Sequence, residues 1–378
     1  MIDYEILRFI WWILIAVLLI GFAITDGFDM GVLNLLPVIG KSNVERRIMI
    51  NTIAPHWDGN QVWLLTAGGA IFAAWPTVYA TSFSGFYIAM VLVLAALFFR
   101  PVGFEYRAKI DDPRWRNAWD WGLFIGGFVP SLVFGVAFGN LLQGVPFEFN
   151  NINQSQYTGT FFGLLNPFAL LCGIISLMML TTQGATWLQM KTTDELHNNS
   201  RVVAQITATV VLVAFVLAGV WLYFKDGFII TSELDRNAQS LLTNKTVIVE
   251  TGAWFKNYAE MPILWVVPAL AIIGAILTVI SSKANRSGWA FFSSSLMIIG
   301  VILTAAVSMF PFIMPSITHP EMSLTVWDST ASHTTLTVML IVAAIFVPLV
   351  LSYTIWSYIK MYGRLDASYL EENKASAY

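Results

Sequence analysis

The sequence is poor in charged residues. Only 11% of its 378 residues are Asp, Glu, Lys or Arg, whereas 57% are hydrophobic. Soluble globular domains carry roughly 25% charged residues, so this composition excludes an ordinary soluble fold. The 15 Trp and 27 Phe are also more than one soluble core of this length accommodates. The composition therefore predicts a protein that crosses a membrane several times.

Cysteine is nearly absent, since Cys172 stands alone in an apolar run. One cysteine cannot form a disulfide within the chain, and apolar surroundings disfavour the thiolate that a catalytic nucleophile requires. The sequence also contains no phosphate-binding glycine loop, no paired-cysteine metal motif and no nucleic-acid-binding signature. These absences exclude thiol catalysis and nucleic-acid partners as leading hypotheses.

A bilayer core of about 30 Å requires about 20 apolar residues for each helical span. We predict nine spans, at residues 8–38, 50–75, 78–100, 120–144, 161–190, 202–224, 261–281, 288–314 and 333–361. The segment before the first span is acidic, and no small-residue cleavage site follows it. We therefore expect no cleavable signal peptide.

Basic residues are distributed unequally between the two sides of these spans. Five lie on the side of the N-terminus: Arg8, Lys225, Arg236, Lys245 and Lys256. Fifteen lie on the other side: Lys41, Arg46, Arg47, Arg100, Arg107, Lys109, Arg114, Arg116, Lys191, Arg201, Lys283, Arg286, Lys360, Arg364 and Lys374. By the positive-inside rule we expect a cytoplasmic C-terminus and a periplasmic N-terminus.

A weak internal repeat suggests a duplication. Residues 21–27 resemble residues 176–184, with Gln183 at the position of Asp26. The fold class that we predict is an all-α polytopic membrane protein with nine transmembrane helices, in two four-helix bundles plus one additional helix. The bundles would occupy residues 1–150 and 155–320, the second with an external loop at 225–260, followed by a ninth helix at 330–362 and a cytoplasmic tail at 363–378.

Ionisable residues within the spans are the first functional candidates, because charge is costly in hydrocarbon unless it faces protein or a wet cavity. Asp26 and Asp29 lie at i and i+3 of the first span, about 60° apart on one helix face. His56 and Asp58 begin the second span, with Asp58 about 12 Å along it from the cytoplasmic start. Since a short connection makes the two spans neighbours, we expect all four residues to form one proton-uptake cluster in the cytoplasmic half.

The alternative role for this cluster is structural. Arg100 ends the third span on the same side, and it is a candidate ion-pair partner for Asp58 or Glu105. Such a pair would keep the carboxylate ionised and unsuited to proton relay. Helix capping by Asp58 is the other structural alternative.

The histidines are unsuited to a haem held by this chain alone. His197 and His319 fall in loops, while His56 and His333 begin helices on opposite sides of the membrane. A bis-histidine haem needs two ligands at matched depth on facing helices. We therefore expect no metal or haem site in this chain.

Aromatic and amide side chains follow Asp58 in the second span. Trp57, Asn60, Gln61 and Trp63, with Arg100 nearby, provide donors for a quinone carbonyl and an indole to stack on its ring. The same residues are equally suited to packing at a helix or subunit interface. Both alternatives stay open from the sequence.

Long motifs along the chain resemble subunit II of cytochrome bd-type ubiquinol oxidases. The resemblance covers essentially the whole chain. Its motifs include Asp26-Gly27-Phe28-Asp29-Met30-Gly31, Glu45-Arg46-Arg47, Pro55-His56-Trp57-Asp58-Gly59-Asn60-Gln61-Val62-Trp63, Phe98-Phe99-Arg100-Pro101, Gln183-Gly184-Ala185, Phe310-Pro311-Phe312-Ile313-Met314-Pro315 and Ser323-Leu324-Thr325-Val326-Trp327-Asp328.

This resemblance implies a haem-free subunit of a complex in the bacterial inner membrane that oxidises quinol and reduces oxygen to water. The partner, subunit I, would hold haem b and haem d, and small single-span accessory subunits, ubiquinol and lipid would be further partners. Protons taken up from the cytoplasm would generate a proton motive force without pumping. The resemblance implies proton delivery through Asp58, with Asp26 and Asp29 beside it, and sometimes a bound ubiquinone.

The rival hypothesis is a stand-alone proton-coupled secondary transporter. Internal repeats and carboxylates within the membrane are typical of that class as well. Only the oxidase subunit is expected to purify together with haem and a second large membrane chain.

Overall fold

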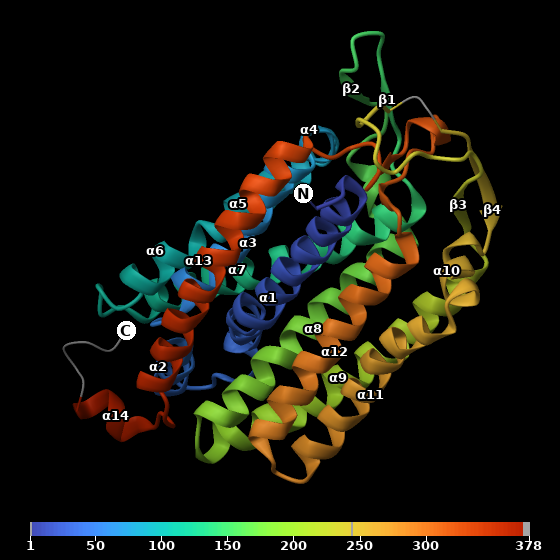
Figure 1. The fold of residues 1–378 in the computed structure, drawn as a ribbon. Coiled ribbons are helices and arrows are strands. Elements are labelled where there is room, and N and C mark those ends of the chain that lie inside the picture. Colours follow the sequence, from blue (N-terminus) through green and yellow to red (C-terminus); the bar gives the residue numbers. More distant parts are fainter. Residues whose placement is uncertain (1, 243–244, 373–378) are drawn as a thin grey trace.

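The computed structural model describes residues 2–242 and 245–372 of the chain as a bundle of long helices with short hairpins at one end (Figure 1). The helices of the first half are α1 (Tyr4–Ile39), α2 (Asn43–Ile53), α3 (Trp57–Ala74), α4 (Pro76–Gly85), α5 (Tyr87–Leu97), α6 (Phe99–Tyr106) and α7 (Pro113–Gln143). Those of the second half are α8 (Pro167–Lys191), α9 (Asp194–Tyr223), α10 (Lys256–Glu260), α11 (Val266–Lys283), α12 (Ser287–Met309), α13 (His333–Lys360) and α14 (Ala367–Glu372).

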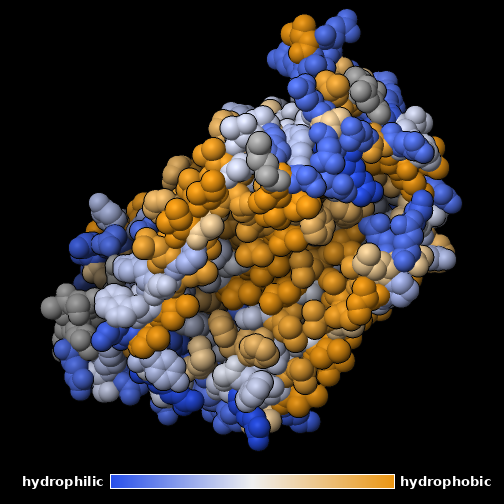
Figure 2. Space-filling model, in the orientation of Figure 1, coloured by the Kyte–Doolittle hydropathy of each residue, from blue (hydrophilic) through white to orange (hydrophobic). Residues whose placement is uncertain are grey.

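Eight helices in the described ranges are long and apolar enough to cross a membrane. The helix α3 has 18 residues and packs along α1, but it is not among these eight, and its first turn is polar. On the face that Figure 2 shows, an apolar band lies between hydrophilic ends. The predicted fold class is therefore confirmed, with nine as an approximate count.

The predicted start of the second span is wrong. Residues 43–53 form the separate helix α2, which begins with a capping box between Ser42 and Glu45. The chain then turns at 54–56, where Pro55 interrupts the helix, and α3 begins at Trp57. Asp58 therefore lies in the first turn of α3, and not about 12 Å along a continuous helix as expected.

Several other boundaries differ from the prediction. The third predicted span is divided into α4, α5 and α6, and the sixth begins at Asp194 rather than at 202. The eighth ends at Met309, because residues 312–314 leave the helix and form a strand. Proline explains part of this difference, since Pro76 begins α4 and Pro311 follows the end of α12.

The two central helices are α1 and α8, which are the first long helices of the two halves of the chain. They approach closely at two glycines: a Cβ added to Gly31 would lie 2.1 Å from the backbone oxygen of Leu180, and one added to Gly184 would lie 2.3 Å from the backbone of Gly31. Around them, α1 packs on α3 and α7, whereas α8 packs on α9 and α12. The duplication itself stays a prediction.

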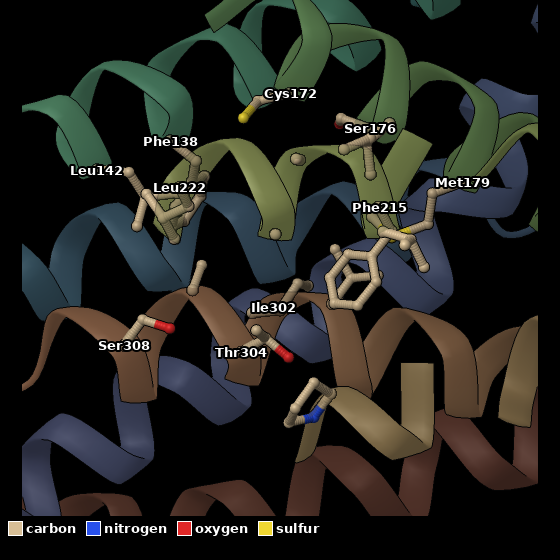
Figure 3. Close-up of a pocket in the computed structure, with 18 of the residues that line it drawn as sticks. Phe138, Leu142, Cys172, Ser176, Met179, Phe215, Leu222, Ile302, Thr304 and Ser308 are labelled. Carbon is tan, nitrogen blue, oxygen red and sulfur yellow. The ribbon is translucent and has the colours of Figure 1, made fainter. Parts of the chain in front are cut away.

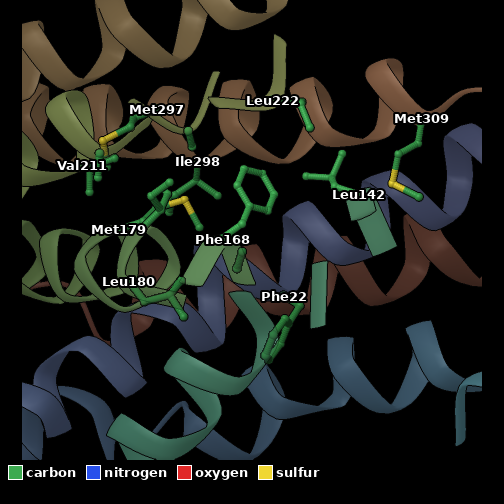
Figure 4. Packing of buried hydrophobic residues seen from close by; sticks show 14 of the residues in the cluster. Phe22, Leu142, Phe168, Met179, Leu180, Val211, Leu222, Met297, Ile298 and Met309 are labelled. Atoms are coloured by element: carbon green, nitrogen blue, oxygen red, sulfur yellow. The ribbon is translucent and has the colours of Figure 1, made fainter. Parts of the chain in front are cut away.

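The larger hydrophobic core lies between these central helices and their neighbours. Figure 4 shows Phe22 of α1, Met179 and Leu180 of α8, and Met297 of α12 among the side chains that fill it. By contrast, α13 has 6% of its apolar window buried. It contacts mainly α1 and α3 (Figure 1).

The end of the bundle opposite α2 is covered by three short hairpins. They pair β1 (Phe147–Phe149) with β2 (Ser155–Tyr157), β3 (Asp226–Ile230) with β4 (Val247–Thr251), and β5 (Phe312–Met314) with β6 (Leu324–Thr325). Arg8, fully buried, donates to the carbonyl oxygens of Arg236 and Ala238 at 2.7 and 3.0 Å. These bonds attach the loop at 225–260 to α1.

The contact between Gly31 and Gly184 yields a stability prediction. We expect Gly184→Ala to lower the thermal stability of the purified protein, because overpacking a tight contact typically costs ~1–3 kcal/mol. Gly288→Ala is the matched control, since a Cβ there meets no atom within 4 Å. Equal melting temperatures for the two variants would contradict the tight contact.

Candidate functional site

A fully buried ion pair joins α1 to α6. Arg100 donates from Nη1 to Oδ2 of Asp26 at 2.9 Å, and its Nη2 forms a second, short bond with Oδ1 of the same carboxylate. Both side chains are 0% exposed. This paired geometry is the strong form of the interaction between arginine and a carboxylate. The structure thus pairs Arg100 with Asp26, whereas the sequence analysis considered Asp58 and Glu105.

Asp29 lies beside this pair without a charged partner of its own. Its Oδ2 accepts a hydrogen bond from Asn60 Nδ2 at 2.9 Å and lies 3.8 Å from Nη2 of Arg100. In the described residues, Oδ1 of Asp29 and Nε of Arg100 have no hydrogen-bond partner. Two carboxylates thus share one guanidinium in a compartment closed to solvent, which leaves one negative charge uncompensated unless a proton is bound.

The network continues from Asp29 to the ninth span. The hydroxyl of Tyr358, on α13, donates to Oδ1 of Asn60 at 2.5 Å. The ring of His56 stacks on that of Tyr358, with centroids 4.3 Å apart. His56, Tyr358, Asn60 and Asp29 therefore form a continuous line of polar side chains from the end of α2 into the bundle.

His56 is buried at the start of α3. Burial, and secondarily the ammonium of Lys191, lowers the pKa of His56 to about 4. The imidazole is thus neutral near pH 7, so it can donate and accept hydrogen bonds without carrying a fixed charge.

Asp58 does not join this network, which corrects the predicted cluster. Its side chain is exposed, and it has no hydrogen bond or ion pair with any residue that the structure describes. The reason is helix geometry: Asp58 and Asn60 are two positions apart on α3, hence about 200° around its axis. Asn60 therefore faces α1, whereas Asp58 faces away from the bundle.

The predicted quinone-binding residues have mostly structural contacts. The Trp57 ring lies 5.6 Å from that of Phe104. Trp63 packs so closely on α1 that a Cβ at Gly21 would lie 2.4 Å from its ring. Asn60 uses both its amide nitrogen and its oxygen in the network, and Gln61 is half-buried. These contacts favour the packing alternative for this segment.

Gln183 occupies the second-half position that the weak repeat compares with Asp26. Its Oε1 accepts from Ser294 at 2.5 Å, and its Nε2 donates to Ser295 at 2.9 Å. Gln183 is fully buried between α1 and α12. It therefore carries hydrogen bonds there without a buried charge.

The four histidines lie in separate surroundings. His197 contacts the Gln189 carbonyl oxygen and Asn285, and His333 contacts the Ile2 carbonyl oxygen. His56 begins α3 beside α2, whereas His319 lies beside the hairpins at the other end. Within the described ranges, no group of three or more His, Cys, Asp or Glu residues could hold a metal ion.

A large apolar cavity of about 590 Å³ lies elsewhere, in the half of the bundle near the hairpins. Figure 3 shows side chains that line it, among them Phe138 of α7, Cys172 and Ser176 of α8, Phe215 of α9 and Ile302 of α12. None of Trp57, Asn60, Gln61, Trp63 and Arg100 lines this cavity. Its size is within the range of small-molecule sites, and its walls suit an apolar ligand.

Several membrane spans and a charged network inside the bundle define an integral membrane protein with an ionisable interior. The chain belongs to the family of cytochrome bd terminal oxidase subunit II, whose model matches residues 7–361. It is thus a subunit of an oxidoreductase complex, and this membership argues against the transporter alternative.

Named relatives agree with this assignment. The chain is 59% identical to cytochrome bd-I ubiquinol oxidase subunit 2 of Escherichia coli K12 over 379 residues, covering 100% of both chains. It is 71% identical to a probable cytochrome oxidase subunit 2 of Haemophilus influenzae over 378 residues, again with 100% coverage of both. A chain of the bd oxidase structure from Geobacillus thermodenitrificans has the same fold, with a TM-score of 0.69 at 14% identity over 94% of this chain and 98% of that one.

The sequence analysis missed Tyr358. A phenol in the last turns of an otherwise apolar span was the available signal, but its partner Asn60 is 298 positions away in the sequence. The structure brings Asp26 and Asp29 together as expected, and Tyr358 connects His56 with them. Asp58 lies outside this group.

Because Asp26 and Asp29 share one guanidinium, we expect different losses of stability when each is replaced by asparagine. Asp26→Asn should strongly lower the thermal stability of the purified complex, since breaking a buried ion pair costs about 3–5 kcal/mol. Asp29→Asn should change stability little, because it removes the uncompensated charge and keeps an acceptor for Asn60. Thermal unfolding of both variants checks this, and similar losses would contradict unequal charge sharing.

Proposed function

We propose that this chain is a haem-free subunit of a quinol-oxidising, oxygen-reducing complex, and that it supports the haem-bearing subunit I and delivers protons to it from the cytoplasm. The observation that carries the proposal is the exposed carboxylate of Asp58 at the start of a membrane helix. Hydrocarbon does not solvate a carboxylate, so in the membrane this face needs a protein or water-filled cover.

The face of α3 around Asp58 has further properties of a subunit interface. Leu65 and Phe72 are 67% and 60% exposed, and Thr66 is also exposed. A Cβ atom added to Gly68 would meet no atom within 4 Å, so the backbone of a helix from another subunit has room to approach there. Small residues that permit close approach are typical of helix contacts in membranes. We infer that subunit I covers this face.

The proton route that we propose begins at the α2 end of the bundle. Neutral His56, Tyr358 and Asn60 lead to Asp29, which is suited to bind a proton because Arg100 is already paired with Asp26. Asp58 lies on the other face of the same helix turn, and it would pass protons across the interface into subunit I.

The haems belong to subunit I in this proposal. When bound there, haem b and haem d transfer electrons from quinol to oxygen. No proton step assigned to this chain involves a residue bonded to a haem, since its histidines have other contacts. The role of this chain is to hold the interface and to move protons.

A bound ubiquinone is the one cofactor that we propose for this chain. The apolar cavity of about 590 Å³ supports it better than the Trp57–Trp63 segment, in which Asn60 already uses its amide nitrogen and oxygen in the network. An isoprenoid chain would occupy the apolar walls, and Ser176 is a polar group that faces the space in Figure 3. Such a quinone would be structural, because none of the residues that line the cavity belongs to the charged network.

The proposed location is the bacterial inner membrane, with the α2 end in the cytoplasm. The turns between α8 and α9 and between α11 and α12 lie at that end (Figure 1). Fourteen of the fifteen lysine and arginine residues on the predicted cytoplasmic side lie within the described ranges, while Lys374 lies outside them. Small single-span subunits and lipid would cover the exposed apolar surface of α13.

The subunit assignment predicts what purifies with the chain. A complex obtained through a tag on this chain should show haem b and haem d bands in a reduced-minus-oxidised spectrum, together with a second large membrane chain. The chain expressed alone should show none of these bands. Haem bands in the chain alone would overturn the haem-free assignment.

The proton role predicts a kinetic defect without loss of assembly. Asp58→Asn should lower oxygen consumption by about tenfold or more, because a positioned proton-transfer group contributes ~10²–10⁴-fold. Haem content and complex yield should stay normal. Glu105→Gln is the control, since Glu105 is another exposed carboxylate near the same end. Normal turnover of an assembled Asp58→Asn complex would exclude the relay.

A further inference from the structure

A second cavity, of about 390 Å³, lies at the outer edge of the second half, between β3, α10 and the end of α12. Unlike the apolar cavity, it is bordered by charges of both signs: Arg236 and Lys256 are basic, and Glu233 and Glu260 are acidic. Aromatic side chains, including Trp327, form other parts of its wall. None of these residues belongs to the charged network or to the proposed subunit interface.

The charged groups at this cavity are available for a ligand. Lys256 and Glu260 are 51% and 65% exposed, and their charged atoms are 3.9 Å apart, longer than a hydrogen bond. Glu233 is exposed and has no partner among the described residues. Arg236 is held in place by Glu5 at 2.8 Å and by the Trp327 ring at 5.0 Å. Because exposed ion pairs contribute little, a ligand can replace the contact between Lys256 and Glu260 at low cost.

The position of the cavity points to the membrane surface. It is bordered by Ser308 and Phe310, where α12 ends, and by Glu260, just before the span that continues into α11. The residues that follow Glu260 are apolar and exposed: Ile263 is 69% and Val266 is 50% exposed. Figure 1 places α10, β3 and β4 on the opposite side of the bundle from α3 and α5, and Figure 2 shows hydrophilic residues above the apolar band at this edge.

We propose that this cavity binds the headgroup of a zwitterionic aminophospholipid. Lys256 and Arg236 would contact its phosphate, and Glu260 and Glu233 would contact its primary ammonium. The acyl chains would lie along Ile263 and Val266 of the exposed apolar surface. A purely anionic lipid would bring negative charge to the two carboxylates, and an uncharged quinone headgroup would form no ion pair with any of the four charged side chains.

Native mass spectrometry of the intact complex tests this proposal. The complex would be released from nanodiscs that contain phosphatidylethanolamine, phosphatidylcholine or phosphatidylglycerol. Phosphatidylcholine keeps the phosphate and masks the ammonium, whereas phosphatidylglycerol has no ammonium. We expect phosphatidylethanolamine to be retained best, by about two- to fivefold, the factor that a partly exposed ion pair contributes.

Two variants test recognition of the phosphate and of the ammonium separately. Lys256→Gln should lower retention of phosphatidylethanolamine and phosphatidylcholine alike. Glu260→Gln should remove the preference for phosphatidylethanolamine over phosphatidylcholine. The controls are Lys283→Gln, at the far end of α11, and Glu250→Gln, on β4 outside the cavity. Because both test positions are exposed, assembly and haem content should stay normal.

Other outcomes would overturn the proposal. Equal retention of the three lipids by the unmodified complex would exclude headgroup recognition, and a preference for phosphatidylglycerol would indicate an anionic-lipid site instead. Retention that the control variants lower as much as the test variants would exclude this cavity. The comparison of lipids in the unmodified complex tests headgroup recognition even if a variant assembles poorly, and the variants assign that recognition to this cavity.

Discussion

The buried ion pair between Arg100 and Asp26 is the contact on which the charged interior of this protein depends. Without it, a guanidinium and two carboxylates would lie in a compartment that neither water nor lipid can solvate. With it, only Asp29 is left with unsatisfied charge, and Asn60 and Tyr358 arrange themselves around that carboxylate. Four helices, α1, α3, α6 and α13, are thereby joined. The network holds them together because separating them would expose charge to hydrocarbon.

The helix α3 has two distinct faces. Asn60 belongs to the interior network, whereas Asp58, two positions earlier, faces away from the bundle. A polar line that starts inside one protein and ends at its surface is complete only when a second protein covers that surface. The same turn of helix thus gives the chain both its internal order and its requirement for a partner, which is consistent with a family whose members are subunits of a larger oxidase.

Much of this arrangement is readable from the sequence, and the exceptions have physical reasons. The long spans follow from hydropathy, and the i, i+3 spacing correctly places Asp26 and Asp29 on one face. The separate helix α2 was not predicted, and the second predicted span includes only its last residues, 50–53, although the capping box of Ser42 and Glu45 is visible in the sequence. The partner of Arg100 was not predictable, because several carboxylates are expected on the same side of the membrane and sequence spacing does not decide among them. Tyr358 was missed because no local pattern connects it with Asn60.

The contact between Gly31 and Gly184 has a consequence for the order in which the chain matures. These residues are more than 150 positions apart, yet each leaves the other no room for a side chain. During translation, α1 enters the bilayer long before α8 emerges from the ribosome. The helices of the first half are therefore in the bilayer before α8 is present to cover the surface of α1 at Gly31. A nascent chain truncated before α8 would lack its central contact, which gives membrane quality control a clear means to recognise it.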